Sequence, residues 1–104
     1  MSSCFTSFNI LEAEEIEKGL TVKTLSAGRV QLRHLVFEPG TLIPDHRHPE
    51  EVVTMVLEGT MEMTVGCEIR NVTAGDVFRV PPKTVHSGRV FLERVVAVSW
   101  SPNQ

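Results

Sequence analysis

The chain has 104 residues, of which 41% are hydrophobic and 22% are charged, and its net charge is −3. This length predicts a single domain over residues 1–104, because half of it would be too short to bury a core of its own. The acidic balance, the 6% aromatic content and the lack of Lys/Arg runs argue against a nucleic-acid surface. No apolar run approaches the ~20 residues needed to cross a bilayer, so no membrane partner is expected. The first residues do not follow a signal-peptide pattern, which favours the cytoplasm.

From residue 20 onward the periodicity is that of short β-strands. Segments that alternate in polarity or are rich in β-branched residues end at Gly, Pro or Asp turn signals; they cover 20–25, 30–38, 52–57, 60–65, 68–72, 77–80 and 91–100. Several short strands separated by such turns are typical of an all-β sandwich or barrel. We therefore expect a barrel over residues 20–101.

The first 19 residues carry a weaker pattern with two interpretations. Residues Asn9 to Glu12 resemble a helix capping box and Gly19 resembles a stop signal, which together would give a short helix over 11–18. The competing interpretation is an extended N-terminal arm over residues 1–19, and we favour the arm.

Three histidines lie in two segments punctuated by glycine and proline. His46 and His48 follow Gly40, and His86 ends the segment that begins at Gly75. In an extended segment, residues i and i+2 point to the same side, so the first two imidazoles can be directed at one point. Neutral imidazole is a common ligand for transition metals. A third imidazole from a neighbouring strand would leave open coordination positions, as a reactive metal site requires.

These two segments resemble the two sequence motifs of the cupin superfamily, in particular those of small single-domain cupins with a conserved barrel. The first motif, Gly-x5-His-x-His-x3,4-Glu-x6-Gly, is matched by Gly40, His46, His48 and Gly59. The second motif, Gly-x5-Pro-x-Gly-x2-His-x3-Asn, is matched by Gly75, Pro81 and His86. The resemblance spans about residues 28–101. It implies a double-stranded β-helix (jelly-roll) barrel with a metal in its mouth, and a homodimer.

Three positions depart from the motifs. The acidic or amide ligand of the first motif would fall on Val52. A one-residue bulge would bring Glu51 into register instead, Glu50 shares the parity of the histidines, and water is the remaining alternative. In the second motif, Lys83 and Val90 replace a glycine and an asparagine, which alters a turn and a neighbour rather than a ligand.

The predicted site follows from these assignments. The metal ligands are predicted to be His46, His48, His86 and Glu51, around one divalent transition metal (zinc, nickel, manganese or iron). Residues of the same inward parity, and those of the next strand, are expected to line the pocket: Val52, Thr54, Met61 and Met63. An arginine could anchor a substrate carboxylate. The favoured interpretation is nevertheless that four basic residues face solvent: Arg33, His34, Arg79 and Arg89.

The ligand set suggests a class of partner molecule. Three histidines without a carboxylate carry no charge, so a bound cation keeps its full charge and favours anionic ligands. The stretches 52–59 and 75–86 also resemble small cupins that act on unsaturated or keto sugars and related carboxylates. We therefore expect a metal-binding cupin that binds or acts on a small sugar acid or keto acid, as an isomerase or lyase with the metal as Lewis acid. The alternatives are a three-histidine iron dioxygenase and a non-catalytic ligand-binding or sensing module.

Overall fold

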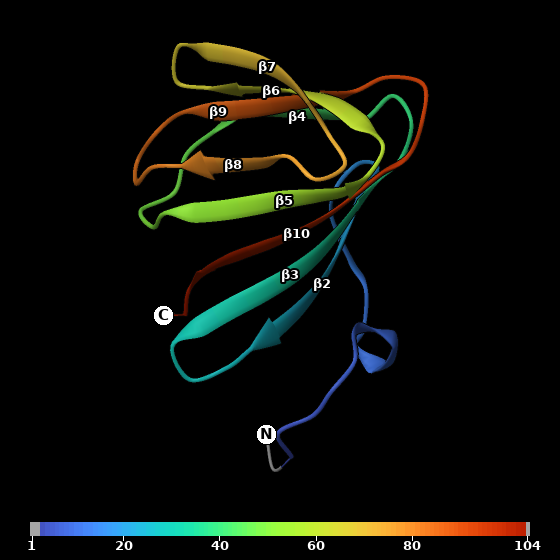
Figure 1. The fold of residues 1–104 in the computed structure, drawn as a ribbon, viewed down its shortest axis with the longest axis vertical. Coiled ribbons are helices and arrows are strands. Elements are labelled where there is room, and N and C mark those ends of the chain that lie inside the picture. The colour runs from blue at the N-terminus through green and yellow to red at the C-terminus, as the bar shows by residue number, and fades with distance from the viewer. Residues whose placement is uncertain (1–2, 104) are drawn as a thin grey trace.

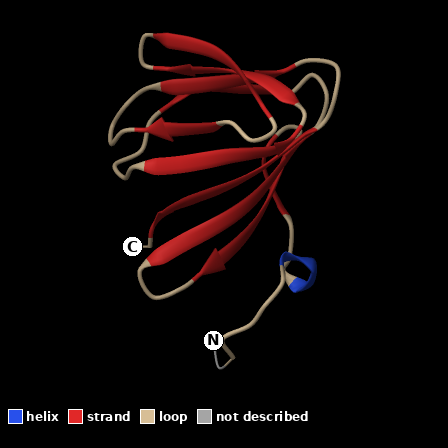
Figure 2. Ribbon diagram, viewed as in Figure 1, coloured by secondary structure: helices blue, strands red, loops and turns tan. Residues whose placement is uncertain are grey.

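The computed structural model describes residues 3–103 and consists of two antiparallel β-sheets that face each other (Figures 1 and 2). The six-stranded sheet has the order β1-β2-β3-β10-β5-β8 and the four-stranded sheet the order β4-β9-β6-β7. The strands are β1 (Glu14–Glu17), β2 (Leu20–Ser26), β3 (Val30–Phe37), β4 (Leu42–His46), β5 (Val52–Glu58), β6 (Thr60–Val65), β7 (Glu68–Thr73), β8 (Val77–Val80), β9 (His86–Val90) and β10 (Val95–Pro102). Strands far apart in the sequence lie side by side, most clearly β3, β10 and β5. The predicted all-β jelly-roll barrel is confirmed.

Apolar side chains from both sheets fill the barrel. The buried core comprises Leu20, Val22, Phe37, Val56, Met61, Met63, Val72, Val90, Val95 and Ala97. In β6 the two methionines are buried while Glu62 and Thr64 between and after them are only partly so, which is the two-residue period of a strand with one face inside. This alternation fixes the register of the four-stranded sheet, because a slip of one residue would turn both methionines outward.

The N-terminal segment is extended apart from a single turn of 3₁₀ helix at Phe8–Ile10 (η1). Strand β1 pairs with β2 across a turn at Gly19, whose φ of 86° suits glycine. The alternative of a helix over 11–18 is therefore wrong, because a helix this short is marginal alone while β1 gains hydrogen bonds from β2. The six-stranded sheet accordingly begins at Glu14 rather than at Leu20. Within residues 3–103 no helix is long and apolar enough to cross a membrane.

Two strands of the four-stranded sheet are missing from the segments that the periodicity predicts, although the histidine spacing indicates an extended segment at 46–48 and a neighbouring strand with the third imidazole. Strand β4 contains Pro44 and β9 contains Ser87-Gly88, residues with low β-propensity, yet β9 pairs with both β4 and β6. The last strand begins at Val95 rather than at Phe91, because residues 91–94 form the connection from β9. Pairing of β4 with β9 joins the two histidine segments in space.

Candidate metal centre

The fold brings the three predicted histidines together. His46 ends β4 and His86 begins β9, where the two residues are cross-strand partners. His48 follows two residues after the end of β4. The ring centroids of His46 and His86 lie 4.0 Å apart, those of His48 and His86 4.8 Å, and those of His46 and His48 5.8 Å. One ligand atom from each ring lies within 4.8 Å of the other two, so the group could hold a metal ion.

Each imidazole is oriented by a backbone carbonyl. The Nδ1 atom of His46 lies 2.9 Å from the carbonyl oxygen of Pro44, that of His48 lies 3.2 Å from Glu50, and that of His86 lies 2.9 Å from Thr84. A carbonyl oxygen only accepts, so Nδ1 must donate, and in the neutral ring the lone pair is then on Nε2. Carbonyl partners of this kind fix the tautomer of metal-binding histidines. The donor set therefore fits a divalent transition metal.

Burial keeps His86 in the form that binds metal. This residue is only 6% exposed, whereas His48 is half-buried and His46 is exposed. Desolvation is the main cause that lowers the pKa of His86 below its ordinary value, and the nearby imidazoles of His46 and His48 lower it further. The hydrogen bond to Thr84 acts in the opposite direction. His86 is consequently neutral at physiological pH, as a metal ligand must be.

A cavity of about 150 Å³ lies in front of the histidines, between the two sheets. Besides the three imidazoles, it is lined by all four of the residues expected there: Val52, Thr54, Met61 and Met63. It is also lined by polar residues of the six-stranded sheet, among them Arg33, Ser99 and Ser101. No aspartate or glutamate among the described residues lines this cavity. The expectation that Arg33 faces solvent is wrong: it is half-buried on the inner face of β3, on the same side as Leu35 and Phe37.

The comparison with protein families agrees with this geometry. The cupin domain model matches residues 33–90, more than half of the chain. The chain belongs to the cupin family. A similar solved structure is an RmlC-like cupin from Shewanella frigidimarina NCIMB 400, with a TM-score of 0.86, 28% identity, and coverage of 99% of this chain and 94% of that chain.

Two further solved structures share the cupin fold at lower identity. KdgF from Halomonas sp. has a TM-score of 0.84 and 21% identity, and the match covers 99% of this chain and 96% of that one. The polyketide cyclase RemF from Streptomyces resistomycificus has a TM-score of 0.86 and 21% identity, with coverage of 98% and 80%. A comparison with curated proteins finds no match.

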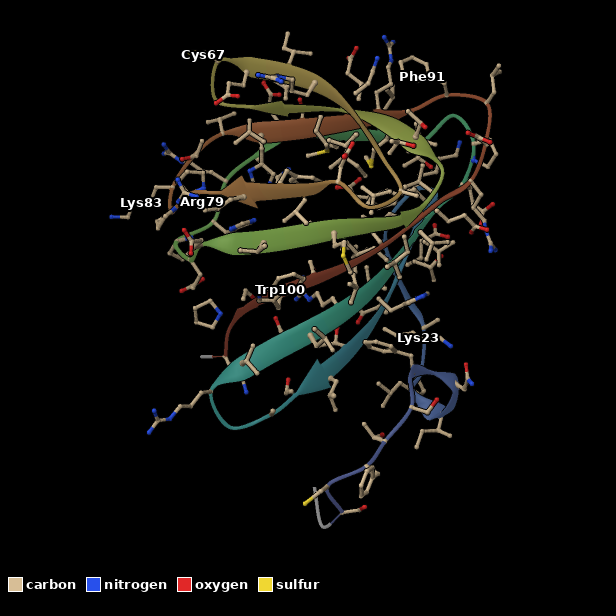
Figure 3. The ribbon with its side chains drawn as sticks, in the orientation of Figure 1. Lys23, Cys67, Arg79, Lys83, Phe91 and Trp100 are labelled. Carbon is tan, nitrogen blue, oxygen red and sulfur yellow. The ribbon has the colours of Figure 1, made fainter. Side chains whose placement is uncertain are left out.

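The carboxylate expected from the cupin motif does not join the histidines. Val52 lines the cavity, so the preceding residue, Glu51, points to the other side of the chain. Its carboxylate is 2.6 Å from Nη1 of Arg79, in an ion pair whose side chains are 43% and 59% exposed. Figure 3 places Arg79 near Lys83, at the end of β8. Ligation by Glu51 stays a prediction, and it would require this ion pair to open.

Lys83 occupies the position of the glycine in the second cupin motif. Its φ of 60° makes it the only non-glycine residue between 3 and 103 in the left-handed region. An L-residue there costs about 1–2 kcal/mol relative to ordinary backbone. Its backbone N–H donates to the carbonyl oxygen of His48 at 2.8 Å. The turn thus keeps the backbone shape of the glycine in the motif and fastens the segment that carries His48.

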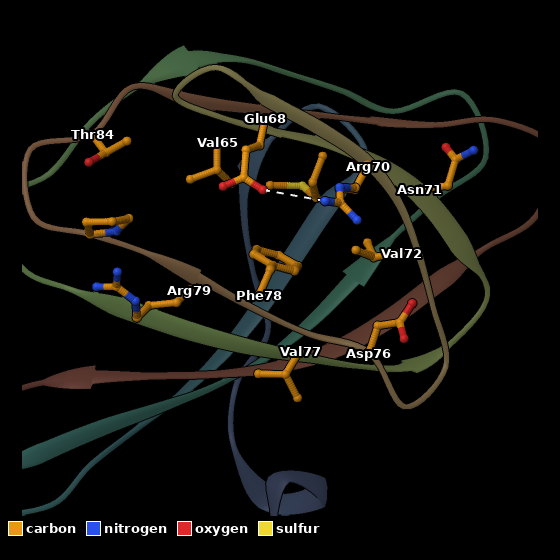
Figure 4. Close-up of a pocket in the computed structure, with 12 residues that line it drawn as sticks. Val65, Glu68, Arg70, Asn71, Val72, Asp76, Val77, Phe78, Arg79 and Thr84 are labelled. Carbon is orange, nitrogen blue, oxygen red and sulfur yellow. Dashed lines mark ion pairs between the residues drawn. The ribbon is translucent and has the colours of Figure 1, made fainter.

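A second cavity, of about 650 Å³, opens between β7 and β8 (Figure 4). It shares Met63 and Phe78 with the histidine cavity but is lined by no histidine. Its charged residues have both signs: Glu68, Arg70, Asp76 and Arg79. Among residues 3–103 the only group of three or more potential metal ligands is that of the histidines, so this larger pocket holds no such group.

Proposed function

We propose that this cupin binds one divalent transition metal through Nε2 of His46, His48 and His86 and presents it to a small sugar acid or keto acid. The observation that carries the proposal is the common orientation of the rings, each with Nδ1 bonded to a backbone carbonyl, in a group only 4.8 Å across. Zinc, nickel, manganese or iron would suit the site. The bound metal would act as a Lewis acid that polarises a carbonyl or carboxyl oxygen, as in an isomerase or lyase.

The chain's own residues prepare the site for that role. Three backbone carbonyls hold the imidazoles in one tautomer, so little reorganisation is needed on binding. Met61, Met63 and Phe78 line the cavity with apolar surface, which strengthens electrostatic interactions inside it. Because the imidazoles bring no negative charge, the metal keeps its full positive charge for the ligand. Glu51 or water would complete the coordination shell.

Metal analysis of tag-free protein tests the proposal. Wild-type protein loaded with zinc, nickel, manganese or iron should retain about one metal per chain after dialysis. His46→Ala, His48→Ala and His86→Ala should each lower the affinity by more than about 100-fold, since the loss of mere supporting groups already costs 10–100-fold. His34→Ala is the matched control, because His34 packs against Phe8 and does not line the cavity. Wild-type protein that retains none of these metals would contradict the proposal.

Reaction type is tested separately from binding. Turnover of a keto or unsaturated sugar acid by zinc-, nickel- or manganese-loaded protein would support isomerase or lyase chemistry. Oxygen consumption that requires ferrous iron would instead assign the protein to the three-histidine dioxygenases. Metal-dependent ligand binding without turnover would make it a binding or sensing module.

We also propose that the protein forms a homodimer. β1 lies at the edge of the six-stranded sheet, and edge strands have unpaired backbone groups that favour pairing with another chain. The N-terminal segment presents exposed apolar side chains, Phe5 at 89% and Ile10 at 76% exposure. Sedimentation should give a mass near twice 11.6 kDa, and deletion of residues 3–11 should reduce it. A mass of one chain for the intact protein would contradict the dimer.

A further inference from the structure

Arg33 has no protein partner for its buried nitrogen. Its Nε is the only fully buried side-chain nitrogen or oxygen without a hydrogen-bond partner in the part of the chain that the structure describes. None of the three ion pairs found among residues 3–103 includes Arg33. Buried polar groups are almost always satisfied, so a buried donor that the protein leaves unpaired sets Arg33 apart from the other described side chains, and the same residue lines the histidine cavity.

The surroundings of Arg33 are polar on one rung of the sheet and apolar on the next. Ser99 pairs in register with Arg33 on one side and with Thr54 on the other, and all three residues line the histidine cavity. The neighbouring rung, deeper in the core, is Leu35, Ala97 and Val56. The six-stranded sheet therefore presents this polar rung, together with Ser101 from the rung on its other side, to a cavity whose other wall carries the imidazoles.

We propose that Arg33 anchors the carboxylate of a small anionic ligand, which the metal site then contacts through its remaining oxygens. This inference rests on the metal binding proposed above and adds the residue that selects the ligand's charge. The guanidinium, a divalent metal and the absence of any lining carboxylate give the cavity a net positive charge. Such a charge favours an anion and disfavours a neutral analogue of the same shape.

The dimensions of the site limit the size of the ligand. The cavity of about 150 Å³ is smaller than the ~300–1,000 Å³ typical of pockets for drug-sized molecules. A groove of about 400 Å³ adjoins it and shares four lining residues with it: Arg33, His48, Val52 and Ser101. Arg33 thus lines both the groove, which Glu50 also lines, and the histidine cavity. A short-chain 2-oxo or 2-hydroxy acid fits this arrangement.

The test compares pyruvate with its neutral analogue pyruvamide by titration calorimetry on metal-loaded protein. Wild-type protein should bind pyruvate at least about tenfold more tightly than pyruvamide, because loss of one charge-assisted hydrogen bond costs a factor of this size or more. Arg33→Met should abolish that preference while its metal content stays that of wild type. Arg33→Lys should restore part of the preference through its charge. Arg29→Met, a change at an exposed arginine in the β2–β3 turn, should have no effect.

Each outcome has a defined meaning. Metal-free Arg33→Met should be at least as heat-stable as wild type, because the substitution removes a buried N–H that has no partner. A large drop in the thermal midpoint would assign Arg33 a structural role and overturn the inference. Equal binding of pyruvate and pyruvamide by metal-loaded wild type, a comparison that needs no variant, would also overturn it and leave the metal site standing. Protein that takes up no metal would overturn both proposals.

Discussion

The two cavities that meet at Met63 and Phe78 differ in how their charged groups are satisfied. In the larger one, between β7 and β8, Glu68 lies 3.9 Å from Arg70, and Asp76 accepts a hydrogen bond from the backbone N–H of Thr73. Both charges of that ion pair are more than three-quarters exposed to water. In the smaller one, an arginine nitrogen has no partner and three imidazoles present free Nε2 atoms.

This difference is the reason why we propose the smaller cavity as the ligand site. Charges that already pair with each other, or with water, gain little from a bound molecule. Groups that are buried without partners gain the most, because the cost of their desolvation is offset only when the ligand arrives. Volume alone would favour the larger cavity. Polar groups without a partner are therefore a better indicator of a ligand site than volume.

The largest effect is expected when Arg33 is given an ion-pair partner from the protein itself, because this removes the difference between the two cavities. In Ser99→Asp the new carboxylate should pair with Arg33 across the strands, and pyruvate affinity of the metal-loaded protein should fall by about 10- to 100-fold. Calorimetry measures this. Asn71→Asp adds the same charge to the cavity between β7 and β8 and should change little. Unchanged binding in Ser99→Asp would mean that Arg33 does not hold the ligand.

Burial of His86 should appear in the pH dependence of stability of the metal-free protein. Its pKa in the folded state lies below the ordinary 6.5, so as the pH falls below 6.5 the unfolded chain takes up a proton first. The contribution of neutral His86 to folding stability is therefore fully present above pH 6.5 and is lost progressively as the pH falls towards the lowered pKa. Chemical denaturation across this range should show a smaller loss in His86→Gln. An equal loss in both proteins would contradict the buried, neutral state of this histidine.

Relief of backbone strain beside the histidine cavity is expected to give a smaller effect. Lys83→Gly removes the left-handed lysine and should raise the free energy of unfolding by about 0.5–1 kcal/mol, after allowance for the greater freedom of glycine in the unfolded chain. Thermal unfolding measures it. Lys23→Gly, in the middle of β2, is the opposite control and should destabilise the protein. A destabilised Lys83→Gly would show that the lysine side chain itself holds the turn.

The smallest effect is expected at the ion pair on the outer side. Arg79→Met should change stability by about 0.5 kcal/mol or less, because both partners are largely exposed and screened by solvent. Glu51→Gln should change stability by a similarly small amount. The metal content of this variant decides whether Glu51 is a ligand. Retention of a full metal complement would leave water as the fourth ligand. A marked loss of metal would establish the carboxylate in the coordination shell and weaken the contrast between the two cavities.

The sequence predicts most of the fold because its central strands are unambiguous. Segments 52–57 and 60–65 combine β-branched or alternating residues with clear turns, and both form strands at the expected places. The histidine spacing also predicts which imidazoles come together. Strands β4 and β9 escaped prediction because Pro44 and Gly88 weaken the local signal, and only tertiary pairing defines them.

Arg33 shows what local pattern could not establish. The parity it shares with Leu35 and Phe37 was a signal that its side chain points inward. Arginine is generally found at the surface, and this preference led to the prediction that Arg33 faces solvent. Its true place depends on the pairing of β3 with β10, which brings Ser99 beside it, and no single segment of sequence specifies that contact. A charged residue whose parity conflicts with its polarity is therefore worth examining as a ligand-binding residue.

Zinc-edge X-ray absorption of zinc-loaded protein tests the central claim most directly, because it counts the ligands of the metal. The account predicts three imidazole nitrogens at about 2.0–2.1 Å, with the remaining ligands oxygen. His86→Ala should reduce the imidazole count or abolish binding. A shell with fewer than three imidazoles in the wild-type protein, or one that contains sulfur, would contradict the assignment of His46, His48 and His86 as the metal centre.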